Sequence, residues 1–434
     1  MNLSFLKHKE VKNAGWIIGV RVVQMLCSLL VSILSARLLG PSNYGLVSYG
    51  ITYTTFFMSL CTLGINSVIV KDFVDHPEEK GEALGSTIVL RLISSSLSIG
   101  IIILISFFLD RGEPETILVV ALCAVCLLFH AFDTIACYFQ SLYQSKYSST
   151  AYLVGYAAAS AYKIVLLLLG KSVRWFALAT SVDYAVIAIL LLCVYKRKSG
   201  PPLSFSWRKG KALLSKSYHY ILSGAMVAIY GQVDKLMLKH MVDQAAVGYY
   251  SIAVSISNMW VFVLTAIIDS MYPTILQLYE PDKIRFERKN RQLYAMVFYV
   301  SVFVSALLTF FGRYAILILY GRSYLPSVGA LSVVSWYTAF SYLGTARNAW
   351  IVCENKQKYL KYTYAAAVVM NIVLNSVMIP VWGIMGAGLA SLITQILTSI
   401  GIPALIPALR PNVKLMLQAI ALKDVLPQRK KNER

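Results

Sequence analysis

The chain contains 434 residues, of which 58% are hydrophobic and only 14% are charged. Soluble domains have about 45–50% apolar and about 25% charged residues, so this chain has too little charge to cover a water-exposed surface. Its richness in aromatic and branched residues also excludes a disordered chain. The composition therefore predicts a polytopic membrane protein. We expect the net charge of +20 to lie in its loops rather than in a nucleic-acid site.

The sequence contains a series of apolar stretches long enough for membrane-spanning helices, which need roughly 20 residues each. These stretches are continuously apolar and do not alternate with a period of two residues, which favours helices over the strands of a membrane barrel. The first run has no processing site, so we expect no cleavable signal peptide. The twelve predicted spans are 13–36, 46–70, 86–109, 116–139, 149–169, 175–195, 217–240, 247–271, 292–312, 328–352, 361–381 and 385–409.

Lys and Arg are distributed unequally between the two sets of loops that these spans create. With the N-terminus inside, 28 basic residues fall in inside segments and seven in outside loops. Cytoplasmic loops of membrane proteins are enriched in Lys and Arg. We therefore expect both termini on the cytoplasmic side, in agreement with an even number of spans.

A basic segment with two prolines divides the predicted spans into two sets of six. We expect an N-terminal six-helix bundle (1–198), a cytoplasmic basic linker (199–216), a C-terminal six-helix bundle (217–409) and a basic cytoplasmic tail (410–434). A short similarity at a fixed offset supports two parallel repeats, with the transport path in the cleft between them. The matching residues are Leu38, Gly45 and Ser48, and Met241, Gly248 and Ser251.

The predicted loops are too short for a catalytic or ATP-binding domain. The sequence lacks the GxxxxGK[ST] motif of phosphate-binding loops. Ser160 and Lys163 form an SxxK pair, but the companion motifs of acylating enzymes are absent. Cys123 and Cys126 form a CxxC pair without the second Cys or His pair of a zinc site. We therefore expect no enzymatic activity, no organic cofactor and no structural metal.

Once the charges counted with the loops are set aside, nine charged residues remain within the predicted spans. Each would cost about 2.5–3.5 kcal/mol if it faced lipid at mid-membrane. We therefore expect these side chains to pair, to reach the interface or to line a water-filled cavity. The basic members are Arg21, Arg91, Lys163, Lys235 and Arg347, and the acidic members are Asp133, Asp183, Asp234 and Asp269.

The five basic residues predict a cationic cleft that receives an anionic substrate from the cytoplasm. Arg21, Lys163 and Arg347 are the strongest candidates, because guanidinium and ammonium groups bind phosphate oxygens. The alternative is that these charges form structural ion pairs, for example Arg91 with Asp133. Deep tyrosines could equally stack on sugar rings or form hydrogen bonds between helices. They are Tyr53, Tyr152, Tyr156, Tyr162 and Tyr230.

Three motifs carry a resemblance to a known family. The first outer turn reads Arg37-Leu-Leu-Gly40-Pro41-Ser-Asn-Tyr44-Gly45, and Val247-Gly248-Tyr249-Tyr250 follows the seventh predicted span. The third motif combines Asn371-x3-Asn375 and Pro380 with Gly383, Gly386 and Ala387. Together they resemble the Wzx-type oligosaccharide flippases, the polysaccharide-transporter branch of the MATE-like MOP superfamily. The resemblance implies an all-α membrane protein with 12 transmembrane helices in two six-helix bundles.

The activity that this resemblance implies is the translocation of undecaprenyl-diphosphate-linked oligosaccharide across the bacterial cytoplasmic membrane by alternating access. Capsule, O-antigen or exopolysaccharide synthesis would use the product. The implied partners are this substrate, membrane lipid, and the glycan polymerase with its chain-length machinery. A MATE-like ion-coupled multidrug antiporter is the alternative. A cavity for cationic drugs should be acidic, so the excess of basic residues favours the flippase. A membrane glycosyltransferase is disfavoured, because it would need a catalytic loop and none is evident among the short predicted loops.

The resemblance also implies an ion-coupling site. Related lipid II flippases hold Na⁺ with an Asp on span seven, an Asn-x3-Asp on span eleven and a Thr on span twelve. Asp234, Asn371 and Thr394 occupy compatible positions here, but Asn375 replaces the second acid. One carboxylate instead of two weakens a Na⁺ site, because Na⁺ prefers hard, charged oxygens. Na⁺ coupling, H⁺ coupling through Asp234, uncoupled flipping and simple polar packing all remain open.

Overall fold

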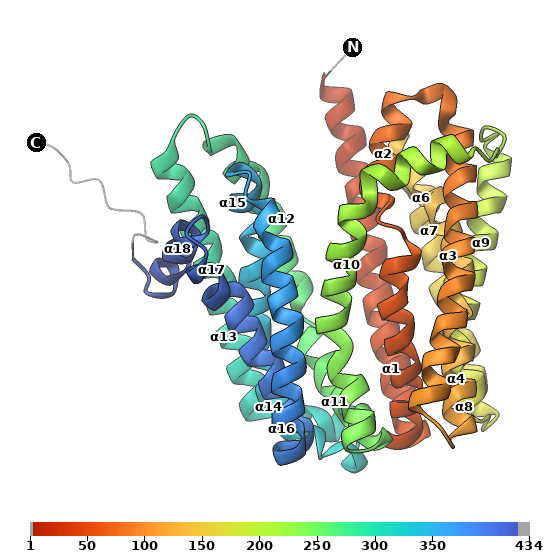
Figure 1. Cartoon of the computed structure of the whole chain (residues 1–434), viewed down its shortest axis with the longest axis vertical. Helices are drawn as coiled ribbons and strands as arrows, with labels where there is room; N and C mark the ends of the chain where they lie inside the picture. Colours follow the sequence, from red (N-terminus) through yellow and green to blue (C-terminus); the bar gives the residue numbers. More distant parts are fainter. Residues whose placement is uncertain (1–2, 424–434) are drawn as a thin grey trace, which may run out of the picture. The chain divides into compact units, whose positions relative to one another are not determined.

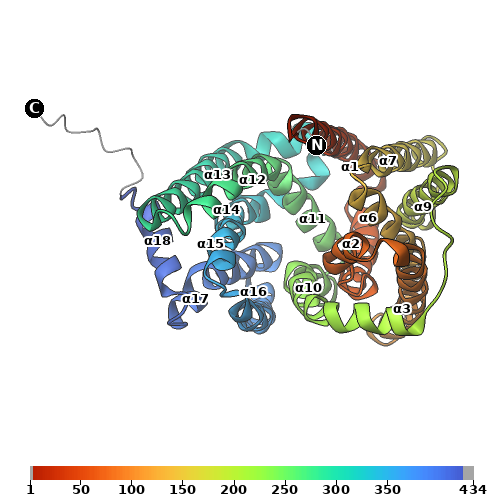
Figure 2. The same cartoon turned by 90° about the horizontal axis from the view of Figure 1, so that it is seen from above.

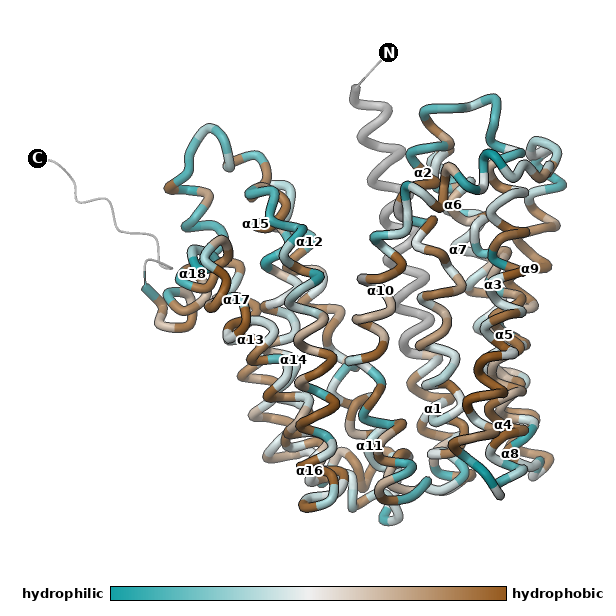
Figure 3. The backbone as a smooth tube through the Cα atoms, viewed as in Figure 1, coloured by the Kyte–Doolittle hydropathy of each residue, from teal (hydrophilic) through white to brown (hydrophobic). Residues whose placement is uncertain are grey.

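The computed structural model describes residues 3–423, with side chains from residue 27 onward except at positions 67 and 223. Throughout this range the chain forms helices and contains no strand. Eight helical stretches of the described chain are long and apolar enough to cross a membrane. The hydrophobic segments run along the middle of the helices, and hydrophilic residues gather at their ends (Figure 3). The predicted all-α membrane class is therefore confirmed, whereas the count of twelve spans stays a prediction.

Contacts divide the chain into two compact units, Met1–Gln232 and Val233–Arg434. The first unit contains a bundle of long helices, coloured red to yellow-green in Figure 1. Its helices are α1 (Leu3–Cys61), α2 (Asn66–Asp75), α3 (Lys80–Leu109), α4 (Pro114–Ala124), α5 (Cys126–His130), α6 (Thr134–Ser141), α7 (Ser145–Leu168), α8 (Val173–Ala177) and α9 (Ala179–Arg197).

Helix α10 (Trp207–Met241) begins in the first unit and ends in the second, since the division falls between Gln232 and Val233. A π-helical turn (Leu397–Gly401) follows the last long helix of the second unit, at Leu360–Ile396, and precedes a four-residue helix at Ile402–Leu405. The helices that follow α10 are α11 (Gln244–Asn258), α12 (Val261–Leu278), α13 (Lys283–Leu319), α14 (Ser327–Ala346), α15 (Asn348–Cys353), α16 (Leu360–Ile396), α17 (Ile402–Leu405) and α18 (Arg410–Ile420).

Two glycines interrupt helices where the sequence predicts turns between spans. Gly40 in α1 has φ +73° and Gly383 in α16 has φ +55°, a region that other residues rarely adopt. Pro41 follows the first break, where its fixed φ suits the start of the next helical segment. These breaks support the predicted separation of spans one and two and of spans eleven and twelve.

The predicted span 247–271 is divided in the structure. Helix α11 ends at Asn258 and α12 begins at Val261, so residues 259–260 break the helix. The stretch predicted at 116–139 is likewise made of α4, α5 and α6 with short interruptions. Hydropathy detects continuous apolar character but not these local changes of backbone geometry.

The predicted linker is packed against α3 rather than extended through solvent. A Cβ at Gly85 would lie 2.4 Å from the Ser204 carbonyl oxygen, so only glycine fits there. Ser86 Oγ donates to the Ser206 carbonyl (3.1 Å) and accepts from the Ser206 amide (2.8 Å). Residues 207–216 of the predicted linker form the start of α10, which crosses the outside of α3 (Figure 2).

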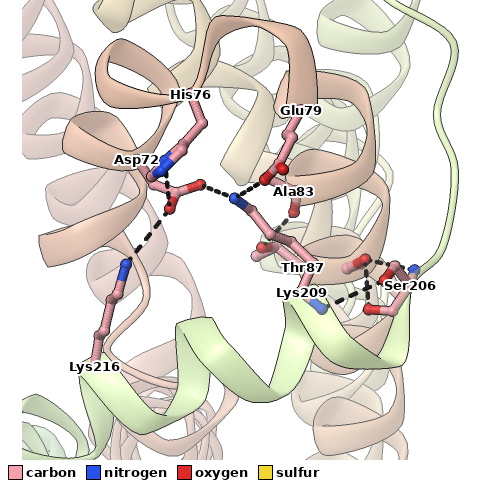
Figure 4. A network of polar contacts seen from close by, with 9 residues as sticks. Asp72, His76, Glu79, Ala83, Thr87, Ser206, Lys209 and Lys216 are labelled. Carbon is pink, nitrogen blue, oxygen red and sulfur yellow. Dashed lines mark hydrogen bonds and ion pairs between the residues drawn. The ribbon is translucent and has the colours of Figure 1, made fainter.

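Ion pairs hold the start of α10 in this position. Lys209 Nζ lies 2.9 Å from Asp72 Oδ2 and 2.6 Å from Glu79 Oε2 (Figure 4). Lys216 approaches the same aspartate at 3.8 Å. The basic residues of the linker therefore bind carboxylates of α2 and of the turn that follows it.

Replacing Gly85 with Ala should destabilise the first unit by about 1–3 kcal/mol, because the new methyl group would push the linker away from α3. The matched control is Gly100→Ala in the same helix, where a Cβ meets nothing within 4 Å. That substitution should raise stability slightly, since Ala is the better helix former. Thermal unfolding followed by circular dichroism in detergent compares the two. Equal midpoints would contradict the tight linker contact.

Candidate functional site

Two of the predicted cationic residues are buried and bound to backbone carbonyls. Arg91 is 0% exposed, and its Nη2 donates to the Thr62 carbonyl (3.0 Å) and to Asn66 Oδ1 (2.8 Å). Its Nε and Nη1 are buried without a hydrogen-bond partner. Arg91 therefore ties α3 to the segment before α2, and the alternative ion pair with Asp133 is not formed.

Arg347 has a comparable position in the second unit. Its side chain is 2% exposed, and Nη1 donates to the Thr398 carbonyl at 3.0 Å. That carbonyl lies in the π-helical turn after α16, so the arginine joins the end of α14 to this turn. Both arginines stabilise helix contacts here, and their role in substrate binding stays a prediction.

The predicted lysines are more accessible than the two arginines. Lys163 is half-buried and lines a cavity of about 210 Å³ inside the first unit, together with Asp183 and Ser160. Lys235 is half-buried in α10. Arg21 lies outside the residues whose side chains are described.

A larger cavity of about 500 Å³ lies in the same unit and is acidic. Asp133 and Asp183 both line it, and no Lys or Arg is among its lining residues. The Tyr152 hydroxyl donates to Asp133 Oδ1, whereas Asp183 Oδ1 is buried without a partner. Tyr156 and Asp183 line both cavities. This cavity lies inside the first unit, so the cationic cleft that the sequence predicts between the two bundles stays a prediction.

The four predicted ion-coupling residues meet in one buried cluster of the second unit. Asp234 is 4% exposed, and its Oδ1 accepts from Asn375 Nδ2 at 2.8 Å. The same amide nitrogen donates to Asn371 Oδ1 (3.1 Å), and Asn371 Nδ2 donates to Thr394 Oγ1 (3.3 Å). Helices α10 and α16 are thus joined by a continuous chain of hydrogen bonds.

Tyr250 and Ser391 complete this cluster and are absent from the predicted set. The Tyr250 hydroxyl donates to Asp234 Oδ2 at 2.7 Å, and Ser391 Oγ donates to the same oxygen. Ser391 precedes Thr394 by three residues, so the two side chains share a helix face. Tyr250 ends the Val247–Tyr250 motif noted in the sequence. The Val247–Tyr250 motif and the three-residue spacing of Ser391 and Thr394 could therefore have indicated these two residues from the sequence.

The charge of the cluster is not balanced by its hydrogen-bonding partners. Asp234 accepts hydrogen bonds from Tyr250, Ser391 and Asn375, which are all neutral. A buried carboxylate is costly unless its charge is compensated. The site can therefore hold a proton or a small cation.

The acceptors of the cluster suit a cation. Asn375 must turn its amide nitrogen toward two acceptors, and its Oδ1 is consequently buried without a donor. Carboxylate, amide and hydroxyl oxygens are the hard ligands that small hard cations prefer. Within the described part of the chain, no group of three or more His, Cys, Asp or Glu is arranged to hold a metal ion.

Comparison with known proteins places these features in context. Residues 11–279 match the model of the family described as "Polysaccharide biosynthesis protein". The chain is 21% identical over 399 residues to the capsular polysaccharide biosynthesis protein CapF of Staphylococcus aureus, covering 89% of this chain and 96% of that protein. It is 32% identical over 178 residues to the probable flippase AglR of Haloferax volcanii, covering 39% and 37% of the two chains.

Solved structures share the fold at low sequence identity. The lipid II flippase MurJ in an inward closed conformation superposes with a TM-score of 0.71 and 14% identity, covering 94% of this chain and 91% of that one. An inward-facing MATE-family multidrug resistance transporter of the MOP superfamily superposes with a TM-score of 0.67 and 15% identity, covering 93% of this chain and 96% of that one. The fold is therefore of the MATE and MurJ type.

Replacing Asn375 with Leu should lower the free energy of unfolding by about 1–3 kcal/mol, because Asp234 and Asn371 would both lose a hydrogen-bond donor. Ser376→Ala is the matched control, since Ser376 is exposed and bonds only to the Ile372 carbonyl. Thermal unfolding in detergent at neutral pH measures the difference. A variant as stable as the control would argue against the cluster as a structural element.

Proposed function

Because this chain belongs to the polysaccharide biosynthesis protein family, we propose that it is a flippase for undecaprenyl-diphosphate-linked oligosaccharide. The lipid-linked repeat unit moves from the inner to the outer leaflet of a bacterial cytoplasmic membrane. The family match over residues 11–279 is the observation that carries this proposal. The fold shared with a lipid II flippase supports it. Capsule, O-antigen or exopolysaccharide synthesis then uses the product.

The proposed mechanism is alternating access of the two six-helix bundles, with both termini in the cytoplasm. The excess of basic residues in the inside segments supports this orientation. The glycan polymerase and its chain-length machinery are the proposed partners on the outer side. Transport itself requires no covalent chemistry, so the protein acts as a transporter rather than as an enzyme.

Recognition of the diphosphate is assigned to the basic residues within the spans. Lys163 and Lys235 are accessible enough to contact a headgroup directly, and Arg21 belongs to the same proposed set. Arg91 and Arg347 use part of their donor capacity on backbone carbonyls. Their proposed contribution is to place positive charge close to the path while they hold its walls together.

The Asp234 cluster is the proposed coupling site. The carboxylate of Asp234, whose hydrogen-bond donors are all neutral, and the Oδ1 of Asn375, which has no donor, support the binding of Na⁺ or H⁺. With a single carboxylate the site would bind Na⁺ weakly, and a proton would neutralise Asp234 directly. Imposing Na⁺ and H⁺ gradients separately on the reconstituted protein would therefore identify the ion that moves with the substrate.

A second candidate function is supported by the acidic cavity of the first unit. Two carboxylates and several tyrosines, with no Lys or Arg among the lining residues, form the kind of site that holds an organic cation. This cavity favours the antiporter alternative, although the family match favours the flippase.

Replacing Lys163 with Ala should slow flipping at least tenfold, because a diphosphate would lose a charged partner in the cavity. The assay uses proteoliposomes with fluorescent undecaprenyl-diphosphate oligosaccharide and quenching of the outer leaflet. Lys171→Ala, which removes an exposed loop charge, is the matched control. Flipping by Arg91→Ala and Arg347→Ala is interpreted only for variants that keep wild-type thermal stability, because both arginines also stabilise helix contacts.

Three outcomes separate the readings of that assay. Flipping by wild type and equally by Lys163→Ala would remove Lys163 from the substrate path but leave the flippase proposal intact. Wild-type protein that moves no lipid-linked sugar would overturn the proposal. Transport of an organic cation that is lost in Asp183→Asn would then establish the antiporter instead.

Replacing Asp234 with Asn should abolish acceleration of flipping by an ion gradient, because the cation loses its charged ligand while the amide keeps the shape of the site. Flipping is measured with Na⁺ and pH gradients imposed separately. Asp269→Asn is the control, an exposed acid in the same unit. Gradient-independent flipping by wild-type protein would contradict coupling at this site.

A further inference from the structure

Helix α18 is fixed firmly along one side. Its buried residues Leu415, Met416 and Ala419 belong to the hydrophobic core of the second unit. Three hydrogen bonds along its length add to this packing, each from a different residue pair. They join Asn412 Nδ2 to the Tyr294 hydroxyl (2.7 Å), Arg291 Nη1 to Gln418 Oε1 (3.1 Å), and the Tyr299 hydroxyl to the Ile420 carbonyl (2.6 Å).

The opposite side of α18 and the turn that follows it are exposed and basic. Arg410, Lys414, Leu417 and Ala421 follow one another at helical spacing and are all exposed. Together with Lys423 and nearby apolar residues, they line a groove of about 400 Å³. Three basic side chains and no carboxylate line this groove among the described residues.

One of these basic side chains is held in place. Arg410 Nε donates to the Ala404 carbonyl at 3.0 Å, which leaves the rest of the guanidinium for a ligand. Lys414 and Lys423 are exposed, and neither forms an ion pair with another residue between positions 27 and 423. Three basic side chains around one groove complement the negative charge of a phosphate group, whose oxygens accept several charge-assisted hydrogen bonds at once.

The position of the groove points to the membrane surface. Helix α18 contacts α13 between Arg291 and Tyr299, where the basic start of α13 gives way to apolar sequence. Such a change from charged to apolar residues marks the boundary between water and hydrocarbon. Leu405, at the end of α17, is 76% exposed, and Leu417 is 51% exposed beside the basic residues. Basic side chains next to exposed apolar ones suit this boundary, where the charges can contact anionic headgroups and the apolar groups can contact hydrocarbon.

We propose that this groove binds the headgroup of an anionic phospholipid in the leaflet that surrounds this end of the bundle. Its phosphate lies among Arg410, Lys414 and Lys423, and its acyl chains run along Leu405 and Leu417. A soluble phosphate compound would leave these leucines without a partner, whereas a lipid satisfies both halves of the surface. The site is independent of the proposed flippase activity.

Native mass spectrometry of the full-length protein in detergent tests this site, with phosphatidylglycerol and phosphatidylcholine as probes. The variant Arg410→Gln/Lys414→Gln/Lys423→Gln should bind phosphatidylglycerol roughly tenfold to a hundredfold more weakly than wild type. Phosphatidylcholine binding should not change. The control Lys71→Gln/Lys358→Gln/Lys361→Gln removes the same charge from exposed positions outside the groove. Leu417→Ser should weaken binding without altering net charge.

The outcomes are distinct. Phosphatidylglycerol binding reduced only in the groove variant supports the proposal. Equal binding by the groove and control variants would overturn it, because charge alone would then account for the lipid. Undecaprenyl phosphate that displaces phosphatidylglycerol from wild type at equal concentration would also overturn it and make the groove a substrate site. Thermal unfolding checks that α18 stays docked, since none of the substituted residues makes its bonds to α13.

Discussion

The constraint on which this structure depends is that a polar group inside an apolar bundle finds no water to bond with. Each such group must obtain its partners from other helices. Asp234 illustrates the consequence, because its donors come from α11 and from two segments of α16 on either side of the break at Gly383. Arg91 and Arg347 meet the same demand by donating to the backbone carbonyls of Thr62, in the turn after α1, and of Thr398, in the π-helical turn after α16. The polar residues that could serve transport therefore also determine how the helices of each unit pack together.

Much of the fold could be predicted from the sequence, because apolar run length, glycine breaks and loop charge act locally. The all-α membrane class follows from such signals and is confirmed, and the polysaccharide biosynthesis family, which was expected from a resemblance in three motifs, is confirmed by the family match. The turn at Gly40 and the break at Gly383 lie where the apolar pattern predicts them. The meeting of Asp234, Asn371, Asn375 and Thr394 was predicted from a resemblance, and their hydrogen bonds agree with it.

The rest depends on which way side chains face, and a continuously apolar helix gives no periodic signal for that. Five basic and four acidic residues in the spans suggest a cationic interior when they are only counted. In the first unit, however, the larger cavity collects the carboxylates of Asp133 and Asp183, while Arg91 turns away to bind Thr62. Counting charges thus predicts neither which of these groups are buried nor the polarity of each cavity, since Asp234 is buried whereas Asp269 is exposed. The break between α11 and α12 escaped prediction for a similar reason, since hydropathy does not report backbone geometry.

The packed linker has a consequence for exchanging parts between related proteins. The repeat similarity invites chimaeras that join the first half of one protein to the second half of another in the short connection after α9. In this chain that connection fits against Gly81 and Gly85 of α3, and the start of α10 is paired with Asp72 and Glu79. A junction there would separate two surfaces that have adapted to each other. A chimaera joined inside α10 near Gln232, where the two compact units divide, would take all of these contacting residues from the same protein.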